Sequence, residues 1–220
     1  MVILACSADQ RLSVARSEAL DTDSKIVISG GAGLVGQNLV VALLDKGYSH
    51  LTVIDKSHHN LQILRSLHQQ VAAVEADLSV PGNWQQCVAE ADILVILHAQ
   101  IGGLSESEFT RNNVQATDHL LNALGEQQSC YLLHVSSSVV NSQADDYYTR
   151  SKLAQEDMVR ASAHPWFILR PTLMFGWFDR KHFGWLSRFM RKMPVFPIPG
   201  SGDYLRQPLY AGDFCSILVA

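Results

Sequence analysis

A glycine-rich turn at residues 25–36, set between an apolar strand and a helical pattern, constrains this chain more than any other feature. Gly30, Gly33 and Gly36 follow directly after the strand. A pyrophosphate can approach main-chain N–H groups closely at such a turn because no Cβ stands in the way, and the positive N-terminus of the helix faces it. Gly36 also lets the helix pack against the strand. The pattern predicts a dinucleotide-binding turn. A plain strand-to-helix turn, which uses glycine only for its shape, is the alternative.

The rest of the chain alternates between short apolar strands and helical patterns. Strands rich in Val, Ile and Leu are expected at 25–29, 51–55, 71–75, 92–97, 130–136 and 166–170. Helices are expected at 34–46, 59–68, 81–90, 106–125 and 147–162. Continuous apolar strands that alternate with helices predict a parallel sheet covered on both faces, which is a doubly wound α/β Rossmann fold.

This pattern divides the chain into three parts. Residues 25–171 are expected to form the nucleotide-binding domain. Residues 1–24 do not fit the pattern, and we expect a disordered extension there. Residues 172–220 begin with a stretch rich in aromatic residues and proline and end in an apolar helical pattern. We expect them to be a partial substrate-binding region.

Composition and charge argue against several classes of function. Apolar residues make up 47% of the 220 residues and charged residues 17%, as in a globular, core-forming protein. The formal charge of -4 gives no reason to expect nucleic acid as a partner. No apolar run reaches the roughly 18 residues that span a bilayer, and the cysteines and histidines lack metal-ligand spacing. We expect a cytoplasmic protein with no metal site and no stable membrane insertion.

Carboxylates that end two of the expected strands indicate where a dinucleotide would lie. Asp55 ends the second strand, where a carboxylate accepts hydrogen bonds from the adenosine ribose and disfavours the extra phosphate of NADP. Lys56 beside it would tolerate that phosphate, and a strand-end turn aspartate is the alternative. Asp77 and Leu78 close the third strand, where the adenine would lie; a plain turn aspartate explains Asp77 nearly as well.

The spacing of Tyr148 and Lys152 is the strongest catalytic signal. Four residues apart on a helix, the two side chains share one face. An ammonium near a phenol favours the phenolate, so we expect Lys152 to lower the pKa of Tyr148 toward neutrality. Such a tyrosine can take a proton from a substrate alcohol while hydride leaves the same carbon. The preceding strand ends in serines at 136–138, and one of their hydroxyls is expected to bind the substrate oxygen.

Together these features resemble an extended short-chain dehydrogenase/reductase of the NAD-dependent epimerase/dehydratase family, over about residues 25–220. The segments that are similar are Gly30, Gly33 and Gly36; Tyr148, Ser151 and Lys152; Asn113-Val-Gln-Ala-Thr117; Arg170-Pro-Thr172; and Arg206-Gln-Pro-Leu-Tyr-Ala-Gly-Asp213.

The resemblance implies roles for particular residues. The catalytic residues would be Tyr148, Lys152 and Ser137, the serine being assigned by alignment on Val140-Asn141, with Ser138 as second choice. The implied cofactor is NAD, bound by Gly30, Gly33, Leu34, Val35, Gly36, Asp55, Lys56, Asp77, Leu78, Ala99, Asn113, Tyr148, Lys152 and Pro171. The implied substrate-binding residues are Ser137, Ser138 and Arg206. Arg206 would hold a nucleotide-sugar diphosphate by charge-assisted bonds, or it is an arginine in a surface loop.

The chain also departs from the family pattern. The histidine of the family's H-L-A-A segment has no counterpart, and His98 stands at an alanine position instead. Asn141 replaces a tyrosine. Ser138 and Val139 stand where nucleotide-sugar 4,6-dehydratases carry an Asp-Glu acid/base pair. The last departure argues against 4,6-dehydration.

We therefore expect an NAD-dependent epimerase or oxidoreductase that acts on a nucleotide sugar. Two alternatives stay open. One is a hydroxysteroid-type dehydrogenase on an apolar alcohol, which the aromatic residues at 175–189 favour. The other is a non-catalytic NAD-binding module.

Two further features are compatible with several functions. The segment 180–192 carries five Lys or Arg and no acidic residue, which suits a packing helix whose basic face helps to attract a diphosphate. The resemblance also makes a homodimer through helices 106–125 and 147–162 possible, without requiring it.

Overall fold

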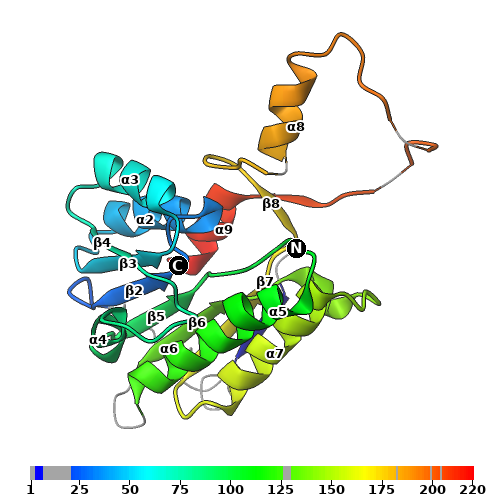
Figure 1. The fold of residues 1–220 in the computed structure, drawn as a ribbon. Helices are drawn as coiled ribbons and strands as arrows, with labels where there is room; N and C mark the ends of the chain where they lie inside the picture. Colours follow the sequence, from blue (N-terminus) through cyan, green and yellow to red (C-terminus); the bar gives the residue numbers. More distant parts are fainter. Residues whose placement is uncertain (1–2, 7–20, 126–129, 182, 199, 204) are drawn as a thin grey trace.

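The computed structural model describes residues 3–6, 21–125, 130–181, 183–198, 200–203 and 205–220 (Figure 1). The described part of the chain contains a seven-stranded sheet in the order β1-β7-β6-β5-β2-β3-β4. Its strands are β1 Ile3–Cys6, β2 Ile26–Ser29, β3 Leu51–Asp55, β4 Ala72–Glu75, β5 Ile93–Ile96, β6 Tyr131–Val135 and β7 Trp166–Arg170.

Strands β2 to β7 are all parallel, and their order reverses at β2. Strand β2 lies between β3, which follows it in the sequence, and β5, which begins the second half of the sheet. Ligands of doubly wound sheets bind at such a reversal, outside the carboxyl ends of the strands. The predicted doubly wound Rossmann fold is therefore confirmed, and the carboxyl edges of β2, β5 and β6 are where the site is to be sought.

Helices cover both faces of the sheet (Figure 1). One face carries α2 Leu34–Asp45, α3 His58–Leu67 and α9 Ala211–Leu218. The other carries α4 Trp84–Ala89, α5 Glu106–Phe109, η1 Thr110–Gln115, α6 Ala116–Leu124 and α7 Tyr147–Ala161. The helix expected at 106–125 is interrupted by η1, a π-helical segment, and such bulges are frequent at functional sites.

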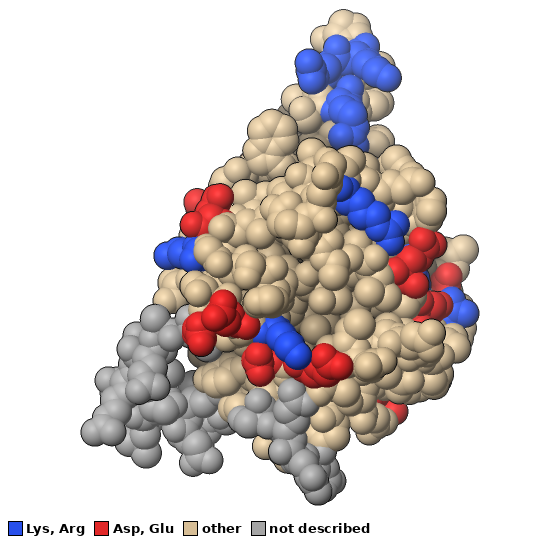
Figure 2. Space-filling model, turned by 90° about the vertical axis from the view of Figure 1, so that its left-hand side faces the viewer, with Lys and Arg blue, Asp and Glu red and all other residues tan. Residues whose placement is uncertain are grey.

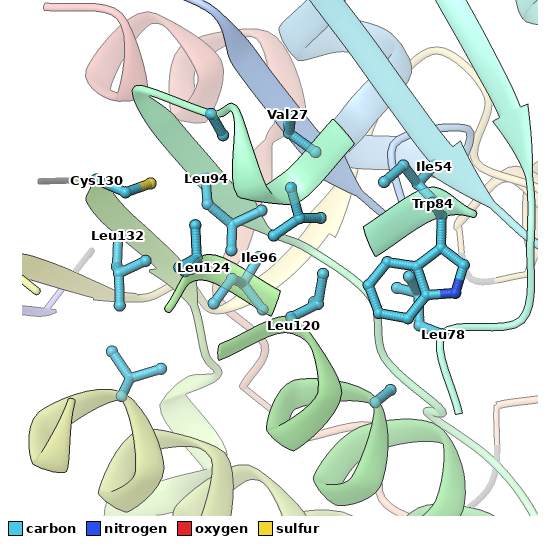
Figure 3. Close-up of a cluster of buried hydrophobic side chains, with 14 of the residues drawn as sticks. Val27, Ile54, Leu78, Trp84, Leu94, Ile96, Leu120, Leu124, Cys130 and Leu132 are labelled. Carbon is cyan, nitrogen blue, oxygen red and sulfur yellow. The ribbon is translucent and has the colours of Figure 1, made fainter. Parts of the chain in front are cut away.

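The core forms two layers because both faces of the strands are covered. Val27, Leu94 and Ile96 point toward α4, α6 and α7, where Trp84 and Leu120 complete the layer (Figure 3). The alternate strand positions point the other way, against buried residues of α2, α3 and α9. Two buried faces explain why the strands are continuously apolar.

The N-terminal residues differ from the expectation of disorder. Residues 3–6 form β1, which pairs antiparallel with β7, so that Ile3 faces Arg170 and Cys6 faces Phe167 in the register. The prediction of disorder is wrong for these four residues. Without β1, strand β7 would be the edge of the sheet, and its outer backbone groups would be unpaired; pairing with β1 satisfies them. Residues 7–20 of the extension lie outside the described residues.

The C-terminal part divides between an arm and the core. Strands β8 Leu173–Phe175 and β9 Pro208–Tyr210 pair in parallel as a small separate sheet. Helix α8, Phe183–Met190, lies between β8 and β9 in the sequence and stands away from the main sheet (Figure 1). Helix α9 returns to the core, where Cys215 is buried beside α2. No helix among the described residues is long and apolar enough to cross a membrane.

Candidate active site

The glycine turn closes tightly at the carboxyl end of β2. Gly30 has φ +69°, and a Cβ there would lie 2.5 Å from the Cα of His98. A Cβ on Gly36 would lie 2.2 Å from the carbonyl oxygen of Gly31. Gly33 precedes the first residue of α2, and no described side chain caps this helix end. Leu34 and Val35 form the first turn, so its main-chain N–H groups are available to an anion.

Asp55 ties the end of β3 to the glycine turn. Its carboxylate accepts hydrogen bonds from the backbone N–H of Ala32, at 3.1 Å, and of Ser57, at 2.9 Å. Burial raises the pKa of Asp55, although these hydrogen bonds oppose the rise. The adjacent Lys56 is exposed, and its ammonium donates to the side chain of Asn112 at 2.8 Å. Asp55 thus lies where a ribose beside the glycine turn would meet it.

Asp77 and Leu78 are arranged as a turn at the carboxyl end of β4. The carboxylate of Asp77 accepts from the backbone N–H of Ser79 at 3.0 Å and from its hydroxyl at 2.7 Å. Burial raises the pKa of Asp77, but the Ser79 hydrogen bonds outweigh burial and the net shift is downward. Leu78 is buried against Trp84 in the core. Asp77 therefore stabilises the turn, which was the alternative to a role beside the adenine. It lies on the same sheet edge as Asp55.

The serines after β6 occupy three different environments. Ser136 is buried and its N–H donates to the carbonyl of Leu169. Ser137 is half-buried and caps the 3-10 helix η2, Ser138–Asn141. The N–H of Ser138 donates to the carbonyl of Pro171 at 2.9 Å, which brings the predicted site residue Pro171 alongside the serines. Of the three, Ser137 is the one that lowers the pKa of Tyr148.

Tyr148 lies in the first turn of α7. The helix begins there because the Asp146 carboxylate accepts from the N–H of Thr149 at 2.7 Å. Burial raises the pKa of Tyr148, against a hydrogen bond to Ser137 that lowers it, and the Asp146 charge adds to the rise. Tyr147 is 39% exposed and packs against Phe109.

Lys152 is buried one turn further along α7, with 1% of its surface exposed. Its ammonium donates to the carbonyl of Val135 at 3.0 Å and to the Gln155 side-chain oxygen at 2.7 Å. Burial lowers the pKa of Lys152 to about 7. We expected Lys152 to lower the pKa of Tyr148; that expectation is wrong here, because burial dominates the tyrosine and the ammonium is hydrogen-bonded elsewhere.

Asn113 joins the π-helical segment η1 to the site. It is fully buried, its amide N–H₂ donates to the Ser151 hydroxyl at 2.8 Å, and its oxygen accepts from the N–H of Gln100 at 2.6 Å. The Ser151 hydroxyl in turn donates to the carbonyl of Tyr148. Asn113 thereby fixes the first turn of α7 against the loop after β5, where Ala99 is exposed.

An ion pair between Glu156 of α7 and Arg170 of β7 joins the two elements. Arg170 was named from the sequence, but Glu156 was not. The fully buried Glu156 accepts from Arg170 at 2.8 and 2.6 Å, and Arg160 also donates to it. Burial raises the pKa of Glu156, but Arg170 and the other donors outweigh it and hold the pKa below its usual value. Arg170 stood in the quoted Arg-Pro segment, whereas nothing in the sequence alone indicated Glu156 as its partner.

Arg206 is not brought to these residues. It is exposed on the segment that leads into β9, and it makes no ion pair with another described residue. The basic residues of 180–192 gather on the arm that carries α8, seen at the top of Figure 2. Among the described residues, no group of three or more His, Cys, Asp or Glu could hold a metal ion.

The site therefore gathers a glycine turn, a carboxylate and a Ser/Tyr/Lys set at one edge of a doubly wound sheet. The family model described as the NAD dependent epimerase/dehydratase family matches residues 26–220. The chain belongs to this family, as the resemblance predicted.

Individual relatives are more distant. The ceramide reductase of Caulobacter vibrioides is 26% identical over 180 residues, which cover 82% of this chain and 55% of that protein. The low-salt glycan biosynthesis protein Agl12 of Haloferax volcanii is 27% identical over 225 residues, or 88% of this chain and 71% of that one. The NAD complex of UDP-glucuronic acid 4-epimerase from Bacillus cereus superposes with a TM-score of 0.76 at 23% identity, covering 89% of this chain and 71% of the epimerase. That likeness shows the fold.

Proposed function

We propose that this chain binds NAD and acts as an epimerase or oxidoreductase on a nucleotide sugar, with Tyr148, Lys152 and Ser137 as its catalytic residues. The observation that carries the proposal is that α7 brings Lys152, one turn after Tyr148, to the carboxyl end of β6, where its ammonium donates to the Val135 carbonyl, on the same sheet edge as the glycine turn. The family match supports the cofactor, and the B. cereus epimerase was solved with NAD.

The glycine turn and its surroundings fit a dinucleotide. Gly30 and Gly36 bring the backbone closer than any side chain would allow, and no described side chain caps the N-terminus of α2. This leaves the N–H groups near Gly33 to a pyrophosphate, and Asp55 to the hydroxyls of a ribose. Bound NAD would supply an acceptor for a hydride from the carbon that carries the substrate hydroxyl.

Tyr148 would move the proton of that hydroxyl. With its pKa raised, Tyr148 keeps its proton at neutral pH, which suits donation to a carbonyl oxygen in the reducing direction. In the oxidising direction it must first become a phenolate, a form that the Ser137 hydrogen bond favours, and Lys152 would hold the ribose of the cofactor. Ser137 would orient the substrate oxygen by hydrogen bonding. Ser138 and Val139 provide no carboxylate for water elimination, so 4,6-dehydration is not proposed.

A nucleotide sugar is proposed because the epimerase that shares the fold acts on one. Arg206 is exposed on the segment before β9 and does not carry this part of the proposal. An apolar alcohol is the second candidate. Trp177 and Trp185 are 73% and 54% exposed on the arm, and one relative is a ceramide reductase. The cytoplasmic location and the homodimer stay predictions.

A turnover screen separates these candidates. The protein would be incubated with NAD and UDP-, GDP- or dTDP-sugars, and in parallel with a hydroxysteroid and a long-chain alcohol, with NADH and epimerised sugar both measured. We expect turnover of a sugar nucleotide that falls about 10²- to 10⁴-fold in Tyr148→Phe, the usual contribution of a general acid–base group. The exposed neighbour provides the matched control Tyr147→Phe, which should keep its activity.

Equal activity of the two tyrosine variants would contradict the assignment of Tyr148. Turnover of the apolar alcohols alone would replace the proposed substrate class. A protein that binds NAD but turns over none of these compounds would favour the non-catalytic module.

A further inference from the structure

A continuous line of buried polar side chains runs from Lys152 to the residue before the glycine turn. Gln155 and Thr117 are fully buried, and His98 is 8% exposed. Gln155 lies 2.7 Å from both the Lys152 ammonium and the Thr117 hydroxyl. His98 lies 3.1 Å from that hydroxyl and 3.0 Å from the hydroxyl of Ser29. Buried polar groups that are fully hydrogen-bonded make rigid networks.

The direction of each hydrogen bond follows from the groups themselves. A lysine ammonium can only donate, so the atom of Gln155 that faces Lys152 is its oxygen. The Gln155 N–H₂ group then points the other way and donates to the Thr117 hydroxyl, with His98 Nε2 also 3.3 Å from it. The Gln155 nitrogen also lies 3.3 Å from the carbonyl oxygen of Asn113. Because an amide N–H₂ group cannot accept, its contact with His98 is favourable only when Nε2 carries no proton, and we assign Nε2 as an acceptor.

This assignment fixes the tautomer of His98. Burial, together with the charge of Lys152, lowers the pKa of His98 to about 3, so the ring is neutral and carries one proton. With Nε2 accepting from Thr117, the proton is on Nδ1 and is donated to the hydroxyl of Ser29. The Ser29 hydroxyl can then donate to the carbonyl of Val95, at 3.3 Å. Every donor from Lys152 to Ser29 therefore points along the line in the same direction.

We infer that Gln155 is a positioning residue for Lys152, and that the line through Thr117 and His98 to Ser29 holds Gln155 in the one orientation that accepts from the lysine. The functional meaning of this inference rests on the proposed role of Lys152. The Val135 carbonyl and Gln155 occupy two of the three ammonium donors. The described residues leave the third N–H of the ammonium to a cofactor or substrate hydroxyl.

The same line couples the catalytic helix to the cofactor turn. Ser29 directly precedes Gly30, and the His98 backbone is packed against Gly30, where a Cβ would lie 2.5 Å from its Cα. A substitution of Gln155 should therefore alter the surroundings of the glycine turn as well as those of the Lys152 ammonium. Filling of space by Gln155 alone would predict neither effect.

Several titratable groups face Lys152 and have to be considered in any pH measurement. Glu156 of α7 raises the pKa of Lys152 through its charge. His98 and His134 are buried, and the lysine charge lowers the pKa of each. Tyr148 lies one turn away on α7. Both histidines are neutral near pH 7, so they do not titrate with Lys152.

The inference is tested by NMR on the full chain without cofactor or substrate, so its outcome is independent of whether the proposed activity exists. The Lys152 side-chain signal, assigned as the one lost in Lys152→Arg, would be titrated in the wild type, Gln155→Glu and Gln155→Leu. Gln155→Glu should raise the pKa of Lys152 by about 1–3 units, because a carboxylate replaces the amide. Gln155→Leu should lower it, because an acceptor is lost. Gln37→Leu, which removes another buried glutamine that donates to Ala32, should leave it unchanged.

A second measurement needs no substitution of the network. Long-range proton–nitrogen correlation of the wild type should show His98 with its proton on Nδ1. A proton on Nε2 would overturn the direction of the whole line, and the same Lys152 pKa in all three Gln155 proteins would overturn the positioning role. If Gln155→Leu does not fold, Gln155→Glu and the His98 tautomer still decide between the two outcomes.

Discussion

The corner where β6 meets α7 and the arm that carries α8 differ in almost every physical respect. In the corner, Lys152, Gln155 and Glu156 are buried and every one of them is hydrogen-bonded to a neighbouring element. On the arm, the aromatic side chains contact mainly one another: Trp185 stacks on Phe189 with ring centroids 5.3 Å apart. The residues proposed as catalytic therefore lie in or beside a buried, hydrogen-bonded part of the molecule, whereas the part expected to choose the substrate has few contacts with the core.

Two tryptophan substitutions test this contrast most strongly. Trp84 is 3% exposed in the core and Trp185 is 54% exposed on the arm. Trp84→Ala should lower the free energy of unfolding by about 3–5 kcal/mol, because it leaves a cavity. Trp185→Ala should cost about 1 kcal/mol or less, as expected for an exposed stacked pair. Urea denaturation of both variants measures the difference, and similar losses would mean that the arm is as firmly packed as the core.

Two glycine substitutions compare the cofactor turn with an exposed loop. Gly30→Ala should lower the free energy of unfolding by about 2–4 kcal/mol. An alanine would be strained at φ +69°, and its Cβ would clash with the His98 backbone. Gly102→Ala is the matched control, because nothing lies within 4 Å of a Cβ there. Thermal denaturation should separate the two variants clearly. If Gly30→Ala is as stable as Gly102→Ala, the turn is looser than its geometry indicates.

The Glu156 ion pair should contribute the next largest effect. Glu156→Gln should lower the free energy of unfolding by about 2–3 kcal/mol. The loss is smaller than for a fully buried ion pair because 18% of the Arg170 side chain is exposed to solvent. A carboxyl whose folded pKa is lowered stabilises the protein above its unfolded pKa and loses that contribution as the pH falls through the folded value. The difference between wild type and variant should therefore shrink toward acid pH, below about pH 4.

An exposed pair provides the control for that substitution. Glu90 pairs with Lys25 at 3.2 Å, and both side chains are more than half exposed. Glu90→Gln should change the free energy of unfolding by less than about 0.5 kcal/mol, because solvent screens such pairs. Equal losses in Glu156→Gln and Glu90→Gln would show that the Arg170 pair does not anchor α7.

The sequence alone was sufficient to predict those strands and helices whose patterns depend on adjacent residues. Strands β2 to β7 and helices α2, α3 and α7 lie within a few residues of their predicted ranges, because apolar periodicity and the glycine turn are properties of adjacent residues. The family was also identified from short segments. Strand β1 was missed because its pairing with β7 joins residues more than 160 positions apart, as in Ile3 with Arg170.

The candidate site could be predicted only in outline, for the same reason. The sequence pointed to Tyr148 and Lys152, and the assignment of catalytic roles to them stays a prediction. The surroundings of Lys152 depend on Val135 of β6 and on Gln155, whose orientation is fixed from α6 and from His98 in the loop after β5. Burial of this kind follows from packing and not from spacing, so the direction of the Tyr148 pKa shift was predicted wrongly.

Binding of NAD and NADP, measured by isothermal titration calorimetry, tests the central claim most directly. The proteins compared would be the wild type, Asp55→Ala and Asp92→Ala, a control whose carboxylate accepts from the Lys25 N–H at the opposite edge of the sheet. We expect the wild type to bind NAD more tightly than NADP, Asp55→Ala to bind NAD more weakly, and Asp92→Ala to bind as the wild type does. Failure of the wild type to bind either nucleotide, or NAD binding that is unchanged in Asp55→Ala, would contradict the account.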